Sequence, residues 1–278
     1  MRTIDVGEVR QAVGDLLRHS AHSLPEDYLE AMRTARVQEL SPTGQEVIEL
    51  LLENAAYAQA ETVPTCQDTG MAILFVEVGQ DVHFSGGDID AALQDATRDA
   101  YADLRKSVVR DPLLRVNSGD NTPALIHWEI VAGDRLRIRT LQKGFGAELM
   151  SRAEMFPPAI GEEGVQQFVI ETVEKAGPNA CPPLIVGVGI GGSLDTVGLA
   201  AKKALLRPIG SVSPEPHVAR LEAELVETIN GLGIGPQGLG GVVTALAVHV
   251  EVVATHIAAL PVAVNLNCSA PRRATLEM

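Results

Sequence analysis

The sequence predicts a mixed α/β fold in which an N-terminal helical region packs against sheets. Two observations predict it: apolar residues recur at spacings of three and four through the first sixty residues, and short apolar runs bounded by glycine and proline follow from residue 71 onward. A chain of 278 residues is long enough to bury a sizeable core. We expect a single domain over 1–278, with a sub-boundary near Pro178 where the glycine- and proline-rich half begins.

The expected elements follow in order along the chain. Helices are predicted over 6–17, 25–35 and 43–60, because their apolar residues share one face and because prolines suit helix starts. Later helices are expected over 88–108, 162–175, 194–206 and 217–229. Apolar runs predict strands over 71–78, 184–188, 242–249 and 262–267, and a hairpin of 124–131 with 135–141 across Ala132-Gly-Asp-Arg.

The charge balance excludes several kinds of partner. The chain has 22 Lys and Arg against 36 Asp and Glu, a formal net charge of −14. Such an acidic protein repels phosphate backbones and anionic lipids, so we expect no nucleic acid and no membrane as partner. Glu251 and Pro261 interrupt the one long apolar segment, which favours buried strands over a membrane span. The first residues contain acids and no signal-peptide core, which predicts a cytoplasmic protein.

Three cysteines, Cys66, Cys181 and Cys268, each lie among turn-forming residues where secondary structure is expected to change. An odd number of cysteines in a cytoplasmic chain argues against a disulfide framework. Thiolates suit iron-sulfur chemistry, and three of them without a fourth leave one coordination position open. A structural zinc site would need four ligands at short spacings, and no C-x-x-C occurs. Three inert buried thiols remain the alternative from counting alone.

The segment Gly187-Val-Gly-Ile-Gly-Gly192 matches the G-x-G-x-x-G pattern of dinucleotide-binding proteins, after a predicted strand and before a predicted helix. That pattern also needs an acidic residue roughly 20 residues later, and none occurs from Thr196 to Pro214. A nucleotide-binding, non-catalytic subunit therefore stays an alternative function. In the other interpretation, the glycines allow close backbone packing and present N–H groups to an anion, which can equally be a carboxylate.

Several ordered motifs surround the three cysteines. They are Cys66-Gln-Asp-Thr-Gly70, Asn117-Ser-Gly-Asp-Asn-Thr-Pro123, Lys143-Gly-Phe-Gly146, Gly187 to Ser193, and Gly235 to Gly241 continuing through Thr255 to Pro261 up to Cys268. Together they resemble the alpha subunit of the class I fumarate hydratase and tartrate dehydratase family of iron-sulfur hydro-lyases, over about the whole chain. The resemblance implies reversible hydration of fumarate to (S)-malate, with tartrate dehydration as the nearest alternative.

The resemblance also implies a cofactor. Cys66, Cys181 and Cys268 would bind three irons of a 4Fe-4S cluster, and the fourth iron would be open to the substrate, a small dicarboxylate. An iron-sulfur electron-transfer protein is a weaker alternative, because such proteins usually close all four iron positions with cysteine.

Roles for further residues follow from the same resemblance. Gln67 and Asp68 would contact the substrate, Asp68 as an acid-base or hydroxyl-orienting group. From the residues alone, an Asx turn is the preferred explanation of Asp68. Arg105, whose planar fork matches a carboxylate, and the backbone N–H of Gly144 would bind the substrate's carboxylates. His256 would approach the substrate, although a lone histidine in an apolar stretch is more often part of a core.

A partner is implied as well. In single-chain members of the family a C-terminal domain supplies the catalytic base and further cationic contacts, and in two-subunit members a separate beta subunit does so. We therefore expect this chain to be inactive without its beta subunit and to form an alpha-beta heterodimer or a larger assembly. The chain departs from the family at Ser269, where His or Trp is usual after the third cysteine, so no role beside the cluster carries over to that residue.

Overall fold

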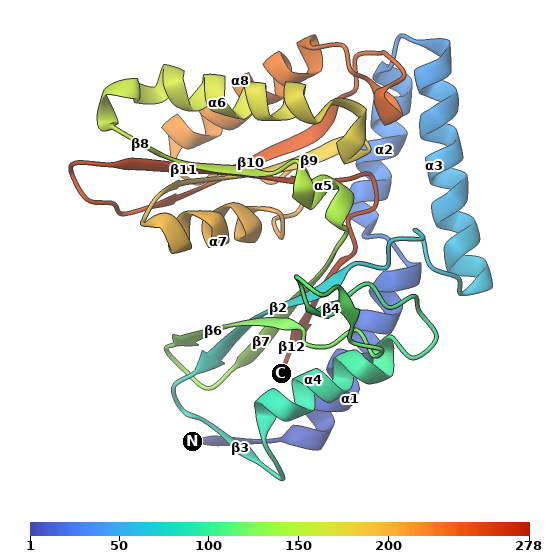
Figure 1. Ribbon diagram of the computed structural model, residues 1–278, viewed down its shortest axis with the longest axis vertical. Coiled ribbons are helices and arrows are strands. Elements are labelled where there is room, and N and C mark those ends of the chain that lie inside the picture. The colour runs from blue at the N-terminus through green and yellow to red at the C-terminus, as the bar shows by residue number, and fades with distance from the viewer. The chain divides into compact units, whose positions relative to one another are not determined.

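The computed structural model describes all residues, 1–278, and divides into two compact units (Figure 1). Unit 1 comprises Met1–Pro25, Ala55–Phe145 and Pro271–Met278, and unit 2 comprises Glu26–Asn54 and Gly146–Ala270. Each unit combines helices with a four-stranded sheet, which confirms the predicted mixed α/β class. The single domain over 1–278 with its sub-boundary near Pro178 stays a prediction.

Unit 1 is built on a sheet with the strand order β12-β7-β2-β6. Its strands are β2 (Met71–Gly79), β6 (Leu125–Val131), β7 (Leu136–Lys143) and β12 (Arg273–Glu277). The two helices α1 (Val6–His22) and α4 (Ile89–Ala100) lie against one face of this sheet (Figure 1). Alternate residues of β2 point toward them, so Leu74 and Val76 join Leu17 and Leu93 in one buried cluster.

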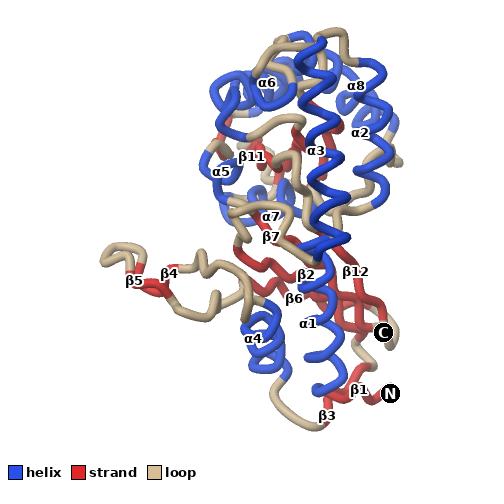
Figure 2. Tube along the Cα trace, turned by 90° about the vertical axis from the view of Figure 1, so that its right-hand side faces the viewer, coloured by secondary structure: helices blue, strands red, loops and turns tan.

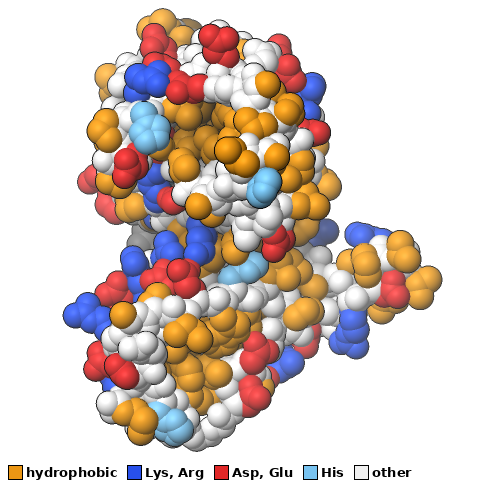
Figure 3. Space-filling view, turned by 90° about the vertical axis from the view of Figure 1, so that its left-hand side faces the viewer, with side chains coloured by type: hydrophobic (Ala, Val, Ile, Leu, Met, Phe, Trp, Pro, Cys, Tyr) orange, Lys and Arg blue, Asp and Glu red, His pale blue; other side chains and the backbone are white.

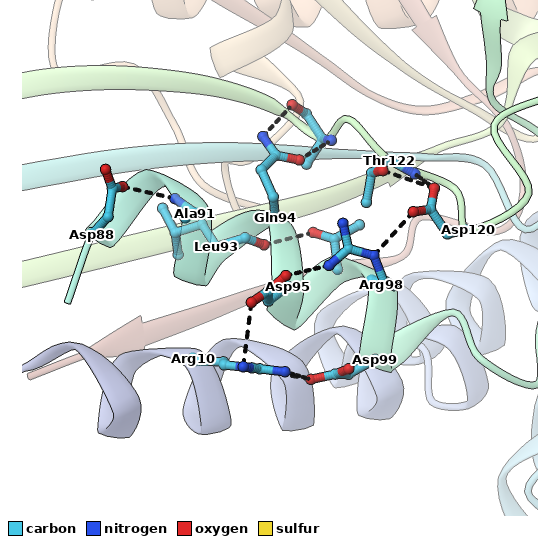
Figure 4. Close-up of polar contacts among 12 residues, drawn as sticks. Arg10, Asp88, Ala91, Leu93, Gln94, Asp95, Arg98, Asp99, Asp120 and Thr122 are labelled. Atoms are coloured by element: carbon cyan, nitrogen blue, oxygen red, sulfur yellow. Dashed lines mark hydrogen bonds and ion pairs between the residues drawn. The ribbon is translucent and has the colours of Figure 1, made fainter. Parts of the chain in front are cut away.

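Polar contacts on the outside of this layer fix the two helices to each other and to the loop before β6 (Figure 4). Arg10 of α1 pairs with Asp95 at 3.3 Å and with Asp99 at 2.8 Å on α4. Arg98 bonds the Asp120 carboxylate at 3.0 Å. Exposed ion pairs contribute little to stability individually. The hydrogen bonds from Thr122 lower the pKa of Asp120, and Arg98 lowers it further by a smaller amount.

Two smaller strand pairs complete unit 1. β1 (Arg2–Asp5) pairs in parallel with β3 (Val82–Ser85). β4 (Val109–Asp111) pairs antiparallel with β5 (Val116–Asn117) and with no other strand. Figure 2 shows β4 and β5 on an extension that projects from this unit.

Unit 2 is a three-layer sandwich around a sheet with the order β10-β9-β11-β8. Helix α7 lies on one face of the sheet, and α6 and α8 lie on the other (Figure 1). The elements are β8 (Arg152–Phe156), α6 (Gly161–Ala176), β9 (Leu184–Gly191), α7 (Leu194–Ala204), α8 (Pro216–Gly231), β10 (Ala245–Val253) and β11 (Leu260–Asn267). Central β9 is buried along almost its whole length, as its apolar sequence predicts.

The remaining helices are α2 (Glu26–Gln38), α3 (Pro42–Glu61), the short α5 (Phe145–Leu149) and three 3-10 turns, η1 (Pro158–Ile160), η2 (Gly177–Ala180) and η3 (Pro236–Gly238). Between α2 and α3, the Glu39 side chain is buried and accepts N–H bonds from Ser41, Val242 and Val243 at 2.8 to 3.1 Å. This carboxylate joins the turn between the helices to the segment that leads into β10.

Two predicted features are wrong. The helix expected over 88–108 ends at Ala100, because the following residues turn into the segment that carries β4. The expected hairpin does not form, because β2 inserts between its two strands and pairs with both. Since β2 is apolar on both faces, the centre of the sheet is the place that buries it best. None of the helices has both the length and the apolar character needed to cross a membrane.

Candidate functional site

Two of the three cysteines lie at the same end of the unit 2 sheet. Cys181 immediately follows η2, three residues before β9, and Cys268 directly follows β11. These strands are antiparallel, and their register pairs Ile185 with Asn267, so the start of one strand meets the end of the other. The backbone N–H of Ser269 donates to the carbonyl of Cys181 at 3.0 Å. The two cysteine loops are therefore adjacent.

A further residue, Gln237, ties these loops together. Its side-chain amide donates to the carbonyl of Pro182 at 2.8 Å and to the Ser269 hydroxyl at 3.1 Å. From α2, the Tyr28 hydroxyl donates to the Ser269 carbonyl at 2.6 Å. Burial, and to a smaller extent the nearby Cys268, raises the pKa of Tyr28, so the phenol stays protonated and remains a donor. Ser269 thus uses its N–H, carbonyl and hydroxyl to connect both loops with α2 and η3.

The backbone at Cys181 is unusual. Its φ of 54° and ψ of 66° lie in the left-handed region, which costs a residue with a Cβ roughly 1–2 kcal/mol. The side chain of Cys181 is exposed, whereas those of Cys66 and Cys268 are half-buried, and all three thiols are free of disulfides. Left-handed residues of this kind concentrate at ligand sites.

The third cysteine begins a loop in unit 1, where its neighbour Asp68 is held in a fixed direction. One oxygen of Asp68 accepts the N–H of Gly70 at 3.0 Å, and the other accepts the N–H of Phe145 at 2.8 Å. The Asx turn expected from the residues is therefore present. The second bond brings the Cys66-Gln-Asp-Thr-Gly motif against the Lys143-Gly-Phe-Gly motif. Gln67 is exposed, and its side-chain oxygen accepts from the Cys66 thiol at 3.6 Å.

The sequence interpretation missed Arg272, which lies beside Gly144, as Asp68 does. A Cβ placed on Gly144 would lie 3.2 Å from Asp68 Oδ2 and 3.4 Å from Arg272 Nη2. The Arg272 side chain is only 1% exposed, and its Nε has no hydrogen-bond partner. A buried guanidinium with an open donor is costly unless an anion accompanies it. The sequence feature that could have indicated Arg272 is its position, four residues after Cys268.

A polar network lies behind this carboxylate and guanidinium. The Tyr101 hydroxyl donates to the Thr69 carbonyl at 3.0 Å and accepts from Gln142 at 3.1 Å. Burial raises the pKa of Tyr101 to about 12, while Arg272 lowers it and Asp68 raises it by smaller amounts. Both charged groups are thus within electrostatic reach of one buried hydroxyl.

Arg105 is joined to the same loop through its backbone. Its carbonyl accepts the Thr69 hydroxyl at 2.6 Å. The buried Asn121, from the Asn-Ser-Gly-Asp-Asn-Thr-Pro motif, accepts the N–H groups of Ser107 and Val108 at 2.7 and 3.0 Å and donates to the Gly70 carbonyl at 3.1 Å. The Arg105 side chain is exposed and makes no ion pair, so it is available to an anion.

His256 lies elsewhere in unit 2. It is exposed in the loop between β10 and β11, and its Nδ1 accepts the N–H of Ala258 at 3.2 Å. That loop adjoins the end of β9, whereas Cys181 and Cys268 adjoin its start. At about 3.3 Å per residue, the length of β9 places the His256 loop roughly 20 Å from the two cysteines. Within one chain the structure does not bring His256 to these two cysteines.

Comparison with known proteins identifies the family. The family described as fumarate hydratase (fumerase) matches residues 10–277. The chain belongs to this family. A Methanocaldococcus jannaschii protein, provisionally named L(+)-tartrate dehydratase subunit alpha, is 39% identical over 96% of each chain. The L(+)-tartrate dehydratase subunit alpha of Escherichia coli strain UTI89 is 36% identical over 98% of this chain and 91% of its own.

Membership of the fumarate hydratase family makes the chain part of a hydro-lyase family, and the glycine-rich motif is then explained without a nucleotide. A Cβ on Gly187 or Gly189 would lie 2.2 or 2.3 Å from the carbonyl oxygens of Ala201 or Val197. These glycines therefore let α7 lie directly on β9. Ser193 and Thr196 cap the start of α7 with their own side chains, so this helix end already has its hydrogen-bond partners.

The donor set fits an iron-sulfur group better than a mononuclear metal. No group of three or more His, Cys, Asp or Glu side chains is placed to hold a single metal ion. The chain offers instead three cysteines that form no disulfide. Two of them lie on adjacent loops, and one of these has a left-handed backbone. Thiolates on loops are the usual ligands of iron-sulfur clusters.

Proposed function

We propose that this chain is the alpha subunit of an iron-sulfur hydro-lyase that reversibly hydrates fumarate to (S)-malate. The observation that carries the proposal is the adjacency of the Cys181 and Cys268 loops in a member of the fumarate hydratase family. Together with Cys66, these residues would hold three irons of a 4Fe-4S cluster and leave the fourth open. When bound, the cluster supplies a Lewis acid for the hydroxyl and a carboxylate of the substrate.

Within this chain, Asp68 would orient the substrate hydroxyl or move its proton. The N–H groups of Gly70 and Phe145 each occupy one of its oxygens, so its direction is set before substrate arrives, and each carboxylate oxygen keeps a further lone pair. Gln67 would hydrogen-bond the substrate through its exposed amide. Arg105 would bind a carboxylate through its exposed guanidinium, and the N–H of Gly144 would serve the other carboxylate.

We place Arg272 in the same site as a positioning residue. Its guanidinium lies against Gly144, and so does the oxygen of Asp68 that accepts the N–H of Phe145. A permanently charged group there favours a fixed orientation of the carboxylate. A catalytic role for His256 stays a prediction.

The proposal includes a beta subunit. The relatives reported above are named as alpha subunits, which favours an alpha-beta heterodimer or a larger assembly here. The residues assembled around Asp68 include no second general base beside it, and removal of a proton from carbon requires one. We propose that the beta subunit supplies this base.

A second candidate substrate is L(+)-tartrate, favoured by the names of the same relatives. Tartrate differs from malate by one hydroxyl group. A site that hydrogen-bonds this hydroxyl rejects the analogue lacking it by as much as about 10⁴-fold, whereas a site without such a contact separates the two weakly.

Anaerobic reconstitution tests the proposal. The alpha and beta chains are co-expressed, the cluster is rebuilt with iron and sulfide, and turnover is measured with (S)-malate and with both tartrate enantiomers. We expect about four irons per alpha chain and a reduced paramagnetic resonance spectrum that shifts on addition of substrate. Each of Cys66→Ser, Cys181→Ser and Cys268→Ser should lose the cluster.

The alpha chain alone is the matched control, and it should bind iron without turning over any substrate. Turnover by the isolated alpha chain at an ordinary enzymatic rate of about 1–10³ s⁻¹ would contradict the role of the beta subunit. Retention of a four-iron cluster in all three serine variants would contradict the ligand assignment. Preference for L(+)-tartrate over malate would select the second candidate.

A further inference from the structure

A projecting arm in unit 1, residues 105–118, plays no part in the chemistry proposed above apart from Arg105 at its base. It contains β4, β5 and the turn that joins them, and its two strands pair only with each other. Figure 2 shows it extending away from the rest of the unit. The tip exposes large apolar side chains, with Leu113 91% and Leu114 76% exposed. Two leucines at the end of a projection are costly in water unless another surface covers them.

The arm is held in shape by its own hydrogen bonds. One oxygen of Asp111 accepts the N–H groups of both Leu113 and Leu114 at 2.9 and 2.8 Å, which fixes the turn. At the base, the N–H of Ser118 donates to the Val108 carbonyl at 2.9 Å. A preformed surface loses little further entropy when it docks, so the leucines are ready for a partner.

The charges of the arm differ from those of the rest of the chain. It has four basic side chains and one acidic side chain, whereas the whole chain has a formal net charge of −14. None of the four cations makes an ion pair with a carboxylate. Figure 3 shows hydrophobic and basic side chains gathered on the arm, which projects at the right of that view. The four are Arg105, Lys106, Arg110 and Arg115.

Helix α3 carries the complementary surface. It contains four glutamates and no lysine or arginine. Glu46, Leu50, Glu53 and Tyr57 follow one another at spacings of four, three and four, so they form one stripe along the helix. Leu50 is 56% exposed and Tyr57 63% exposed, and the two glutamates are exposed and make no ion pair. We call these four residues the α3 stripe.

We propose that the arm of one chain docks on the α3 stripe of a second copy of this chain. Leu113 and Leu114 cover Leu50 and Tyr57, and Arg110 and Arg115 meet the glutamates of the stripe. The tip is almost fully exposed within one copy, so this match is not made inside a single chain. In a two-fold dimer the arm of each copy docks on the α3 stripe of the other. The contact therefore occurs twice, and the assembly is closed at two copies. Nucleic acid would suit the cations but not the leucines.

Sedimentation velocity of the full chain over a range of concentrations tests the proposal, both alone and with the beta subunit. We expect a dimer that weakens as salt rises, because exposed charges take part. Leu113→Asp with Leu114→Asp should weaken dimerisation about 100-fold, the equivalent of two tenfold steps. Leu149→Asp, at a leucine that is 74% exposed outside both surfaces, is the matched control and should leave the dimer unchanged.

Exchanging the charges of the arm and the α3 stripe distinguishes a direct contact between them from a general effect of net charge. Arg110→Glu with Arg115→Glu should weaken the dimer about tenfold, and so should Glu46→Arg with Glu53→Arg. All four changes together should restore it to within about threefold. A chain that stays monomeric, a dimer unaffected by the leucine changes, or the absence of restoration would overturn the proposal. Loss of beta-subunit binding with the dimer intact would overturn it too, and would assign the arm to that partner.

Discussion

Gly144 is the residue at which adding a single methyl group should disturb the candidate site. A methyl group there would lie 3.2 Å from Asp68 Oδ2 and 3.4 Å from Arg272 Nη2, so one of these groups has to move. We expect Gly144→Ala to lower kcat/KM of the alpha-beta complex at least about tenfold, the equivalent of about 1.4 kcal/mol. Steady-state kinetics with (S)-malate measures it.

Gly146→Ala provides the control two residues later. The nearest atom to a Cβ at Gly146 is the Asn179 carbonyl oxygen at 3.6 Å, an ordinary contact, so its kinetics should match the wild type. Equal activity of the two variants would show that the position of Asp68 does not limit turnover.

Gln237 tests whether the two cysteine loops need to be tied together. Gln237→Asn keeps an amide that tolerates the left-handed backbone found there, at φ 52°, but it shortens the reach to Ser269 and Pro182. We expect lower cluster occupancy after anaerobic reconstitution and a loss of about 1–3 kcal/mol in stability. Iron and sulfide analysis measures the first and urea unfolding the second. Gln167→Asn, on the exposed side of α6, should change neither quantity.

At the scale of elements, the contact between α7 and β9 depends on glycines. Gly187→Ala would place a methyl group 2.2 Å from the Ala201 carbonyl oxygen, so the helix has to move away from the sheet. We expect a loss of about 1–3 kcal/mol or more, measured by thermal unfolding. Within α7 itself, Gly198 has no atom within 4 Å of its Cβ position, and Gly198→Ala should stabilise the protein by about 0.5–1 kcal/mol. Equal stability of both variants would contradict the close packing.

The turn between α2 and α3 makes stability depend on pH through Glu39. Burial acts to raise the pKa of this carboxyl, but the N–H bonds from Ser41, Val242 and Val243 outweigh it, and the pKa is lowered. A lowered pKa gives stability that is present above the ordinary glutamate range and is lost as pH falls through the folded value. Glu39→Gln should therefore lower the free energy of unfolding by about 1.5–3 kcal/mol at pH 7.

Urea unfolding at neutral and acidic pH checks this sign. The difference in free energy of unfolding between Glu39→Gln and the wild type should become smaller as pH falls. A gap that widened in acid would mean that the wild-type carboxyl is not held ionised by these bonds. Glu30→Gln, at an exposed glutamate on α2 without an ion pair, serves as the control.

The periodicity of single elements was enough to predict most helices, because α1, α2, α3 and α6 each bury a stripe that the local sequence displays. Strand partners are set by distant segments, so nothing near 124–141 indicated that β2 would separate β6 from β7. The same limit applies to the site. Turn chemistry around the cysteines predicted loops at strand ends, whereas the burial of Arg272 beside Gly144 depends on segments far apart in the chain.

At the scale of the whole molecule, the chain passes between its two units four times. Unit 2 takes α2 from a segment that precedes most of unit 1, and that segment supplies Tyr28 and Glu39 to the Ser269 and Val242 loops. We expect the fragment 146–270 to be poorly folded alone and to gain structure when the peptide 26–54 is added. Circular dichroism with a titration of the peptide measures this. A fragment already cooperative without the peptide would contradict the role given to α2.

The order of the strands in unit 1 has a consequence for synthesis on the ribosome. Strand β7 ends at Lys143, and its outer neighbour β12 begins at Arg273. While the whole of 146–270 is being translated, β7 therefore remains an open sheet edge with unpaired N–H and carbonyl groups. Open edges of this kind recruit other strands, and partly synthesised chains are prone to such errors. The nascent protein thus passes through a long interval in which this edge is open to pairing with other chains.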